Sequence, residues 1–151
     1  MPNLLELPSR PNINPRALKN SKQPSARVKL NGYATTAPIS VGTGSVLIHT
    51  CTDYAVDEIY LWAGNYATSG TSHTLEIEIG GDGTFSDLSK TLSVPVPKQT
   101  GLMQIYPGVP HEHVTVYARA DHDDHINIIG YAVRHYRLDI SDADLGYDGG
   151  D

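Results

Sequence analysis

The stretch Thr74-Leu75-Glu76-Ile77-Glu78-Ile79 alternates polar and apolar side chains without a break. Successive residues of a β-strand point to opposite faces of a sheet. The three aliphatic side chains are therefore expected to face a core, whereas Thr74, Glu76 and Glu78 are expected to face water. Gly80-Gly81-Asp82-Gly83 follows directly and marks a turn. This stretch predicts one half-buried strand of an antiparallel sheet.

Short alternating runs of this kind repeat from residue 26 onward, separated by turn residues. Their spacing of about 8 to 12 residues is typical of sandwiches and barrels. We therefore expect an all-β chain folded as an antiparallel two-sheet β-sandwich that is jelly-roll-like, with an immunoglobulin-type sandwich as the alternative. In the last run, Ile128-Ile129 followed by Gly130 predicts a bulge or bend. Eight strands are predicted, over Ala26–Ala34, Ser45–Cys51, Asp57–Ala63, His73–Ile79, Ser89–Val96, Gly101–Tyr106, His113–Ala120 and His125–Arg137.

The composition is that of a single globular domain rich in turns. The chain has 151 residues, with 14 glycines and 10 prolines, and this balance favours strands and turns over long helices. It contains no run of about eighteen apolar residues, so no membrane span is predicted. Because no charged and then apolar leader opens the sequence, the chain is expected to be made in the host cytoplasm without a signal peptide.

Charge and proline content divide the chain into three segments. Residues 1–25 hold five prolines and predict an extended basic arm, residues 26–138 the β-sandwich domain, and residues 139–151 an acidic tail. Six bases and one acid give the first 30 residues a formal charge of +5, and five bases and sixteen acids give the remainder −11. Opposite charges at the two ends can hold neighbouring copies or two faces of a larger assembly. An acidic body repels phosphate, so nucleic acid is not expected as a partner.

No catalytic constellation is recognisable in the sequence. Neither Gly-x-Ser-x-Gly nor His-Glu-x-x-His occurs, so the protein is expected not to be an enzyme, and no cofactor is predicted. Cys51 is the single cysteine, and His49 lies two residues before it, but no third group that would orient a thiol and base can be assigned. A core or interface cysteine is the simpler interpretation.

Histidines and acids gather in residues 111–125 and would suit a divalent metal. His113 and Asp121 fall at opposite ends of one predicted strand, however, which separates them by about 26 Å. No metal site is therefore predicted. Asp82 and Asp87 lack the spacing of a calcium loop and are assigned to a hairpin tip.

Tyr60 and Trp62 share one face of a predicted strand, and Ile59 and Leu61 share the other. One of the two faces must be core, and the sequence leaves open which pair is buried. Exposed rings could stack on sugars, which keeps a carbohydrate-binding β-sandwich module as an alternative function.

Contacts with other proteins are predicted in the arm and near the C-terminus of the body. Tyrosine and arginine are enriched at protein interfaces, and apolar side chains in a charged arm provide anchors on a neighbouring subunit. The candidate partner-binding residues are Leu4, Leu5, Leu7, Arg10, Ile13, Arg16, Leu18, Lys19, Lys22, Tyr117, Arg119, Tyr131, Arg134 and Tyr136.

Taken as a whole, the chain combines a β-sandwich body, a proline-rich basic arm, an acidic tail, one unpaired cysteine and no catalytic constellation. This architecture resembles the accessory structural proteins of tailed-bacteriophage virions, and most closely the capsid decoration (cement) proteins. The resemblance implies a non-enzymatic protein on the outer shell of the capsid, commonly a homotrimer, whose termini clamp adjacent major capsid subunits. A neck, tail or baseplate component of a virion is the alternative within the same group.

Overall fold

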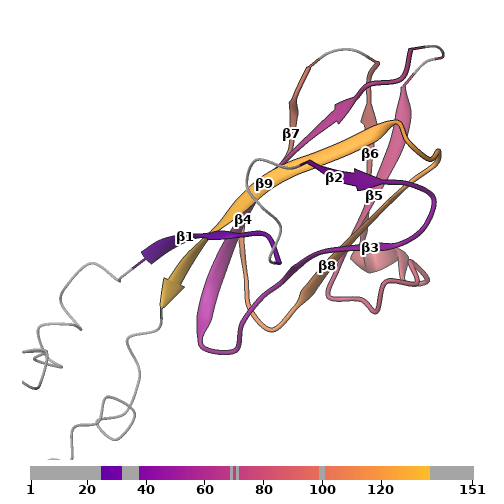
Figure 1. The fold of residues 1–151 in the computed structure, drawn as a ribbon. Coiled ribbons are helices and arrows are strands. Elements are labelled where there is room, and N and C mark those ends of the chain that lie inside the picture. Colours follow the sequence, from indigo (N-terminus) through magenta and orange to yellow (C-terminus); the bar gives the residue numbers. More distant parts are fainter. Residues whose placement is uncertain (1–24, 32–37, 69, 71, 99–100, 137–151) are drawn as a thin grey trace, which may run out of the picture.

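The computed structural model describes residues 25–31, 38–68, 70, 72–98 and 101–136. The predicted acidic tail and all of the predicted arm except Ser25 lie outside these described residues. Within the described residues, one short 3-10 helix, η2 (Leu88–Lys90), accompanies the strands (Figure 1). The strands in this part of the chain are β1 (Ser25–Lys29), β2 (Ile39–Val41), β3 (Val46–Thr50), β4 (Ala55–Asn65), β5 (His73–Ile79), β6 (Thr91–Val96), β7 (Met103–His111), β8 (Thr115–Ala120) and β9 (Ile126–Tyr136).

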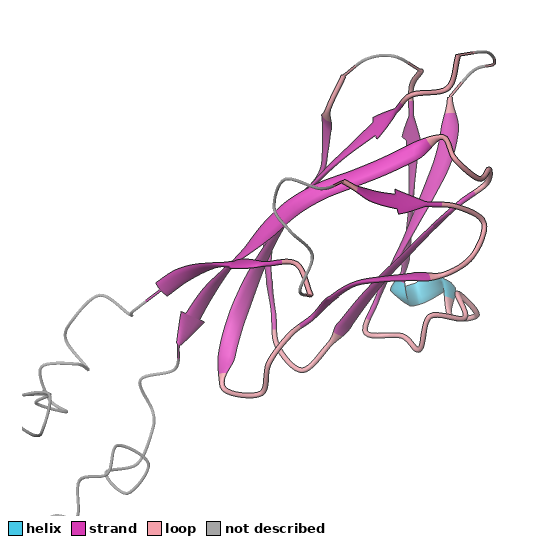
Figure 2. Cartoon of the chain, viewed as in Figure 1, coloured by secondary structure: helices cyan, strands magenta, loops and turns pink. Residues whose placement is uncertain are grey.

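The strands form two antiparallel sheets, which confirms the prediction of an all-β sandwich. The larger sheet has the order β1-β9-β4-β7, with β2 also paired to β9, and the smaller sheet has the order β3-β8-β5-β6. From β2 onward, every connection passes from one sheet to the other except the β5–β6 connection. Figure 2 shows these two layers of strands, with η2 between β5 and β6. This strand order is that of a jelly roll, and it differs from the ABED and CFG sheets of an immunoglobulin-type sandwich.

Two short strands share one edge of β9. β1 pairs with Tyr131–His135 and β2 pairs with Ile126–Ile128, so both lie along the same side of β9 (Figure 1). β2 was not among the eight predicted strands, because an element of three residues is too short to show a periodic pattern. The expected strand Ala26–Ala34 is present only as β1 within the described residues.

The predicted bulge at Gly130 is wrong on the side of β9 that pairs with β4. The two strands keep one unbroken register, from Ala55 opposite Tyr136 to Asn65 opposite Ile126. Gly130 is required instead for a close approach, since a Cβ there would lie 2.1 Å from the backbone oxygen of Tyr60.

The bulges occur elsewhere, on β7 and β3. The β4–β7 register shifts between Ile59 and Tyr60, which leaves Gly108 without an opposite residue, and Gly108 has a φ of 80°. The prediction that the strand ends at Tyr106, before Pro107-Gly108, is therefore wrong: β7 continues to His111. β7 runs on through both prolines because it is an edge strand, whose outer N–H groups need no partner in the sheet.

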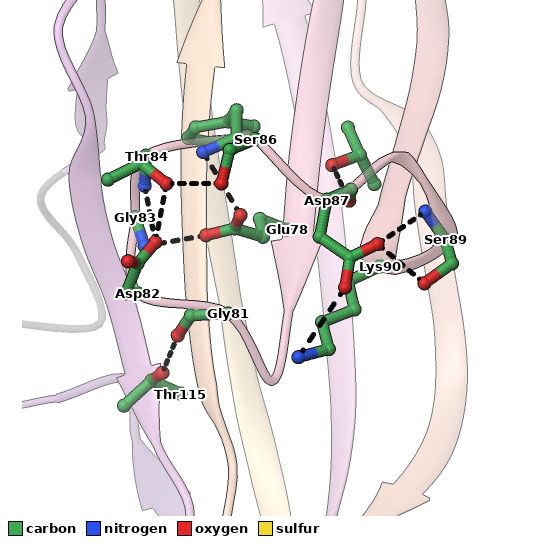
Figure 3. A network of polar contacts seen from close by, with 12 residues as sticks. Glu78, Gly81, Asp82, Gly83, Thr84, Ser86, Asp87, Ser89, Lys90 and Thr115 are labelled. Carbon is green, nitrogen blue, oxygen red and sulfur yellow. Dashed lines mark hydrogen bonds and ion pairs between the residues drawn. The ribbon is translucent and has the colours of Figure 1, made fainter.

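The core lies between the sheets and follows the predicted alternation in most strands. Leu75 and Ile77 of β5 are fully buried, as expected. Glu78 is the exception: it was expected to face water, yet only 1% of it is exposed. The loop after β5 folds over its carboxylate, which accepts the backbone N–H groups of Gly83 at 2.6 Å and Phe85 at 3.0 Å (Figure 3).

The carboxylates of Asp82 and Asp87, in the β5–β6 connection, accept hydrogen bonds from residues of the same loop. Asp82 accepts hydrogen bonds from the backbone N–H and hydroxyl of Thr84, at 3.0 and 2.6 Å, and Asp87 accepts the same pair from Ser89 (Figure 3). These hydrogen bonds lower the pKa of Asp82 and of Asp87. The geometry agrees with the assignment of this segment to a hairpin tip.

Candidate functional site

β4 carries a strict alternation that decides which of its faces is core. Ile59 and Leu61 are fully buried, whereas Tyr60 and Trp62 are only partly buried on the opposite, outer face of the larger sheet. The sequence left open which pair is buried. The smaller sheet covers the face of β4 that carries Ile59 and Leu61, so this pair is core.

The outer rings of β4 meet a tyrosine from the neighbouring strand β9. The Tyr60 ring stacks on that of Tyr131, with centroids 5.1 Å apart and planes 23° apart, and the Trp62 centroid lies 5.8 Å from that of Tyr131. The Arg27 guanidinium of β1 lies 4.2 Å from the Tyr131 centroid, in cation–π range. Three strands thus bring one arginine and three aromatic rings together.

Apolar side chains and a hollow adjoin these rings. The hollow has a volume of about 610 Å³, and a second hollow of about 430 Å³ shares Leu102 and Ile129 with it. Leu102 lines both hollows, and 58% of its side chain is exposed, so it adds apolar surface next to the rings. We call this surface the aromatic face, and its residues are Arg27, Tyr60, Trp62, Leu102, Ile129 and Tyr131.

Two features hold Tyr60 in place within the aromatic face. Its ring packs against Gly108 of β7, where a Cβ would lie 2.4 Å from the ring. Its hydroxyl donates a hydrogen bond of 3.1 Å to Glu58, and this hydrogen bond raises the pKa of Tyr60 above its ordinary value. These contacts hold the Tyr60 ring in one position in the folded chain.

The predicted partner-binding residues of the body do not form one surface. Tyr131 belongs to the aromatic face, whereas Tyr117 and Arg119 lie on β8 of the other sheet, where Arg119 pairs with Glu76 and its guanidinium lies 4.4 Å from the Phe85 centroid. Tyr136 stacks on Tyr54, with centroids 6.3 Å apart.

Arg134 points into the sandwich, where its guanidinium pairs with the buried Asp57 carboxylate. The predicted residues Leu4, Leu5, Leu7, Arg10, Ile13, Arg16, Leu18, Lys19 and Lys22 lie outside the described residues. Sequence reasoning did not select Arg27, Leu102 or Ile129, and it considered Tyr60 and Trp62 only for sugar binding. Their shared face depends on strands that are distant in sequence.

A buried polar bridge joins the two sheets. The Asp57 carboxylate of β4 receives two hydrogen bonds from Arg134 of β9, at 2.8 and 2.9 Å, and lies 2.8 Å from Nε2 of His49 in β3. Burial alone would raise the pKa of Asp57, but the hydrogen bonds from Arg134 and His49 outweigh burial and lower it. The sequence offered no third group that could orient His49 and Cys51, and in the fold Asp57 lies in that position.

This bridge is not arranged for thiol chemistry. Burial, followed by the negative charge of Asp57, raises the pKa of the Cys51 thiol to about 11, so the thiol is protonated at neutral pH. Asp57 is occupied by Arg134, and Nδ1 of His49 accepts the backbone N–H of Asn31 at 3.3 Å. His49, Cys51 and Asp57 lie close enough together for a metal, but the imidazole and carboxylate already have protein partners.

The histidines of residues 111–125 lie at both ends of β8. His113 contacts Asp53 at 3.0 Å before the strand begins, and His111 contacts the Tyr106 hydroxyl at 2.5 Å. Burial lowers the pKa of His111. His122 and His125 follow the strand and meet His73, a residue of β5 that sequence reasoning did not include.

The fold is a jelly-roll β-sandwich whose larger sheet carries a cluster of aromatic rings and one arginine on its outer face. No protein-family model and no curated protein matches the chain. A solved structure described as "Bacillus endospore appendages form a novel family of disulfide-linked pili" is similar to it, with a TM-score of 0.46 and 11% sequence identity. The match covers 78% of this chain and 92% of that one.

The neighbour's own description is of a pilus-forming endospore appendage. Within the described residues, no helix is both long and apolar enough to cross a membrane.

Proposed function

We propose that this chain is a non-enzymatic structural subunit that binds other protein subunits through the aromatic face. The observation that carries this proposal is the clustering of Arg27 with the rings of Tyr60, Trp62 and Tyr131, beside a hollow that the exposed Leu102 also lines. Tryptophan, tyrosine and arginine supply most of the binding energy at protein interfaces, especially near the centre of a patch.

The packing of the rings favours a protein partner over a sugar. A sugar stacks on an open ring face, whereas the Tyr131 ring already stacks on Tyr60 and lies beneath Arg27. The stacked cluster offers ring edges, hydroxyl groups and a guanidinium, which suit the mixed surface of another protein.

The buried polar bridge also supports a non-enzymatic role. Its thiol is protonated at neutral pH, and its carboxylate and imidazole are engaged in holding the sheets together. A catalytic thiol needs a lowered pKa and access to substrate, and Cys51 has neither.

The finer proposal is a virion protein, namely a decoration protein on the capsid surface that forms a homotrimer and binds the major capsid protein. Jelly rolls are a common architecture of viral capsid domains. The sequence adds a basic arm that leads directly into β1, whose Arg27 belongs to the aromatic face. Arm and face together would give each copy several weak contacts, which act jointly over a shell. A neck, tail or baseplate position would be distinguished by copy number per particle.

The test combines oligomeric state and capsid binding of the full chain. We expect Trp62→Ala to shift the protein from trimer toward monomer in sedimentation velocity, and to reduce its co-sedimentation with capsids that lack it. Leu92→Ala is the control, because Leu92 is an exposed apolar residue that lies on β6 of the other sheet. Unchanged assembly and capsid binding in Trp62→Ala, at native circular dichroism, would refute the proposed face.

A carbohydrate-binding module is the second candidate, and it is favoured by the partly exposed rings of Trp62 and Tyr131 beside a hollow of about 610 Å³. Binding on a glycan array that Trp62→Ala abolishes, together with an unchanged oligomeric state in that variant, would replace the structural proposal.

A further inference from the structure

A second polar cluster lies at the end of the sandwich where β5 begins and β8 ends. His73, the first residue of β5, is only 8% exposed, and its Nδ1 lies 3.1 Å from Oδ1 of Asp121. Nδ1 of His122 lies 3.5 Å from the same carboxylate oxygen. One ligand atom from each of these three residues lies within 4.8 Å of the other two.

These separations are those of ligands around a small cation. Bonds of about 2.0 to 2.2 Å at tetrahedral angles place neighbouring ligand atoms about 3.4 Å apart. The two measured distances from Asp121 Oδ1, 3.1 and 3.5 Å, already bracket that value. The cluster therefore needs little movement to surround an ion.

Two buried nitrogen atoms of the cluster have no hydrogen-bond partner among the described residues. They are Nε2 of His73 and Nδ1 of His125. The His125 ring centroid lies 4.6 Å from that of His73 and 5.9 Å from that of His122, so the His125 ring packs beside the cluster. Nδ1 of His73 is the nitrogen at ligand distance from Asp121, so Nε2 of the same ring is not a ligand to the same ion.

The turn that carries three of these residues is held on both sides. The Asp121 N–H donates to the Thr74 carbonyl at 3.1 Å, and the carbonyl of His125 accepts from Tyr66 at 3.0 Å. Between them, Oδ1 of Asp123 accepts the backbone N–H of Thr43 at 2.7 Å. A ligand set on a fixed turn and a strand is preorganised for binding.

We propose that His73, Asp121 and His122 bind a divalent transition metal ion of the Zn²⁺ type. Two imidazoles and one carboxylate supply three protein ligands, and a water molecule would complete the tetrahedral set. The ion joins the start of β5 to the β8–β9 turn. Imidazole ligands favour Zn²⁺ over Mg²⁺ or Ca²⁺, which prefer oxygen ligands.

Among the described residues, the Asp121 carboxylate pairs with imidazoles and not with a guanidinium or ammonium group. The His49, Cys51 and Asp57 group differs, because Arg134 already neutralises its carboxylate.

The test is isothermal titration of ZnCl₂ into the full chain, purified without a histidine tag. We expect one Zn²⁺ per chain, a rise in Tm with Zn²⁺ and not with Mg²⁺, and the strong visible absorption of four-coordinate Co²⁺ when Co²⁺ replaces it. His122→Ala should weaken Zn²⁺ binding at least about tenfold, as expected for the loss of a ligand.

His113→Ala is the matched control, since His113 contacts Asp53 at the opposite end of β8, and it should bind Zn²⁺ like the wild type. Because His73 is buried and its replacement could unfold the chain, the exposed His122 is the primary variant, and Asp121→Asn is the second. Failure of the wild type to bind Zn²⁺, or equal binding by wild type, His122→Ala and Asp121→Asn, would overturn the proposal. Neither result would affect the proposed role of the aromatic face.

Discussion

Replacing Asp57 by asparagine tests whether the buried polar bridge holds the two sheets together. Asp57 is fully buried, and its carboxylate accepts two hydrogen bonds from Arg134 at 2.8 and 2.9 Å. Asparagine has nearly the same shape but no charge, and its amide group presents N–H donors to a site that holds donors already. Arg134 is then left in the interior without its counter-charge.

The expected loss is about 3 kcal/mol in the free energy of unfolding. Removing one partner of a buried ion pair costs about 3 to 5 kcal/mol. The lower value applies because the Arg134 side chain is 14% exposed and keeps some contact with water. For a domain of this size, the loss corresponds to a fall of roughly 10 °C in Tm.

Urea denaturation of the full chain, followed by circular dichroism, measures this loss. Arg134→Met and the double variant complete a double-mutant cycle, and we expect the double variant to lose at least about 1 kcal/mol less than the sum of the single losses. Lys90→Met is the surface control: it breaks a half-exposed pair with Asp87 and should change stability by less than about 0.5 kcal/mol.

The pH dependence has a definite sign. The pKa of Asp57 is lower in the folded chain than in the unfolded chain, so its contribution is present above the unfolded pKa and is lost as pH falls through the folded pKa. The stability difference between wild type and Asp57→Asn should be constant above about pH 5 and shrink below about pH 4. The proposed bridge would be refuted if Asp57→Asn lowered the free energy of unfolding by less than about 1 kcal/mol at neutral pH. It would also be refuted if the loss in the double variant equalled the sum of the two single losses.

Three further predictions concern backbone space, the β5–β6 loop and the thiol. Gly130→Ala should lower the free energy of unfolding, measured by urea denaturation, by about 2 kcal/mol, because its Cβ would lie 2.1 Å from the Tyr60 carbonyl oxygen. In the control Gly64→Ala, the new Cβ would lie 3.6 Å from Leu102, and the loss should be less than half as large. Glu78→Gln should lower stability by about 1 to 3 kcal/mol through the loss of its charged acceptor for Gly83 and Phe85, and a Tm equal to wild type would contradict this. The pKa of Cys51 is about 11, so little of the native thiol is ionised at neutral pH. Iodoacetamide should therefore alkylate it at least about 100-fold more slowly than the urea-unfolded thiol, as measured by mass spectrometry. Equal rates would show that Cys51 is accessible.

The strands that sequence predicted best are those with uninterrupted alternation. β5 occurs at His73–Ile79 as expected, since alternation over seven residues specifies both the strand and its buried face. The largest errors came where neighbouring strands matter. Pro107 and Pro110 continue β7 because it lies at a sheet edge, and Glu78 is buried because a later loop covers it.

The candidate sites were less predictable because each joins residues that are distant in the sequence. The aromatic face needs β1, β4 and β9 side by side, and alternation alone could not tell whether Tyr60 or Ile59 faces outward. The cluster of His122 and His125 is completed by His73, which lies 48 residues before Asp121. No local pattern connects β5 with the β8–β9 turn.

The sequence by itself determined the all-β class, the positions of most strands and the absence of recognisable catalytic motifs, because alternation and turn residues are local signals. Only the tertiary structure decided which faces are covered and which polar groups meet. In β3 the register shifts between Leu47 and His49, so that Ile48 and His49 are both buried and His49 reaches Asp57. A one-residue shift in pairing reverses the direction of a side chain, and that shift depends on the neighbouring strand rather than on the residues themselves.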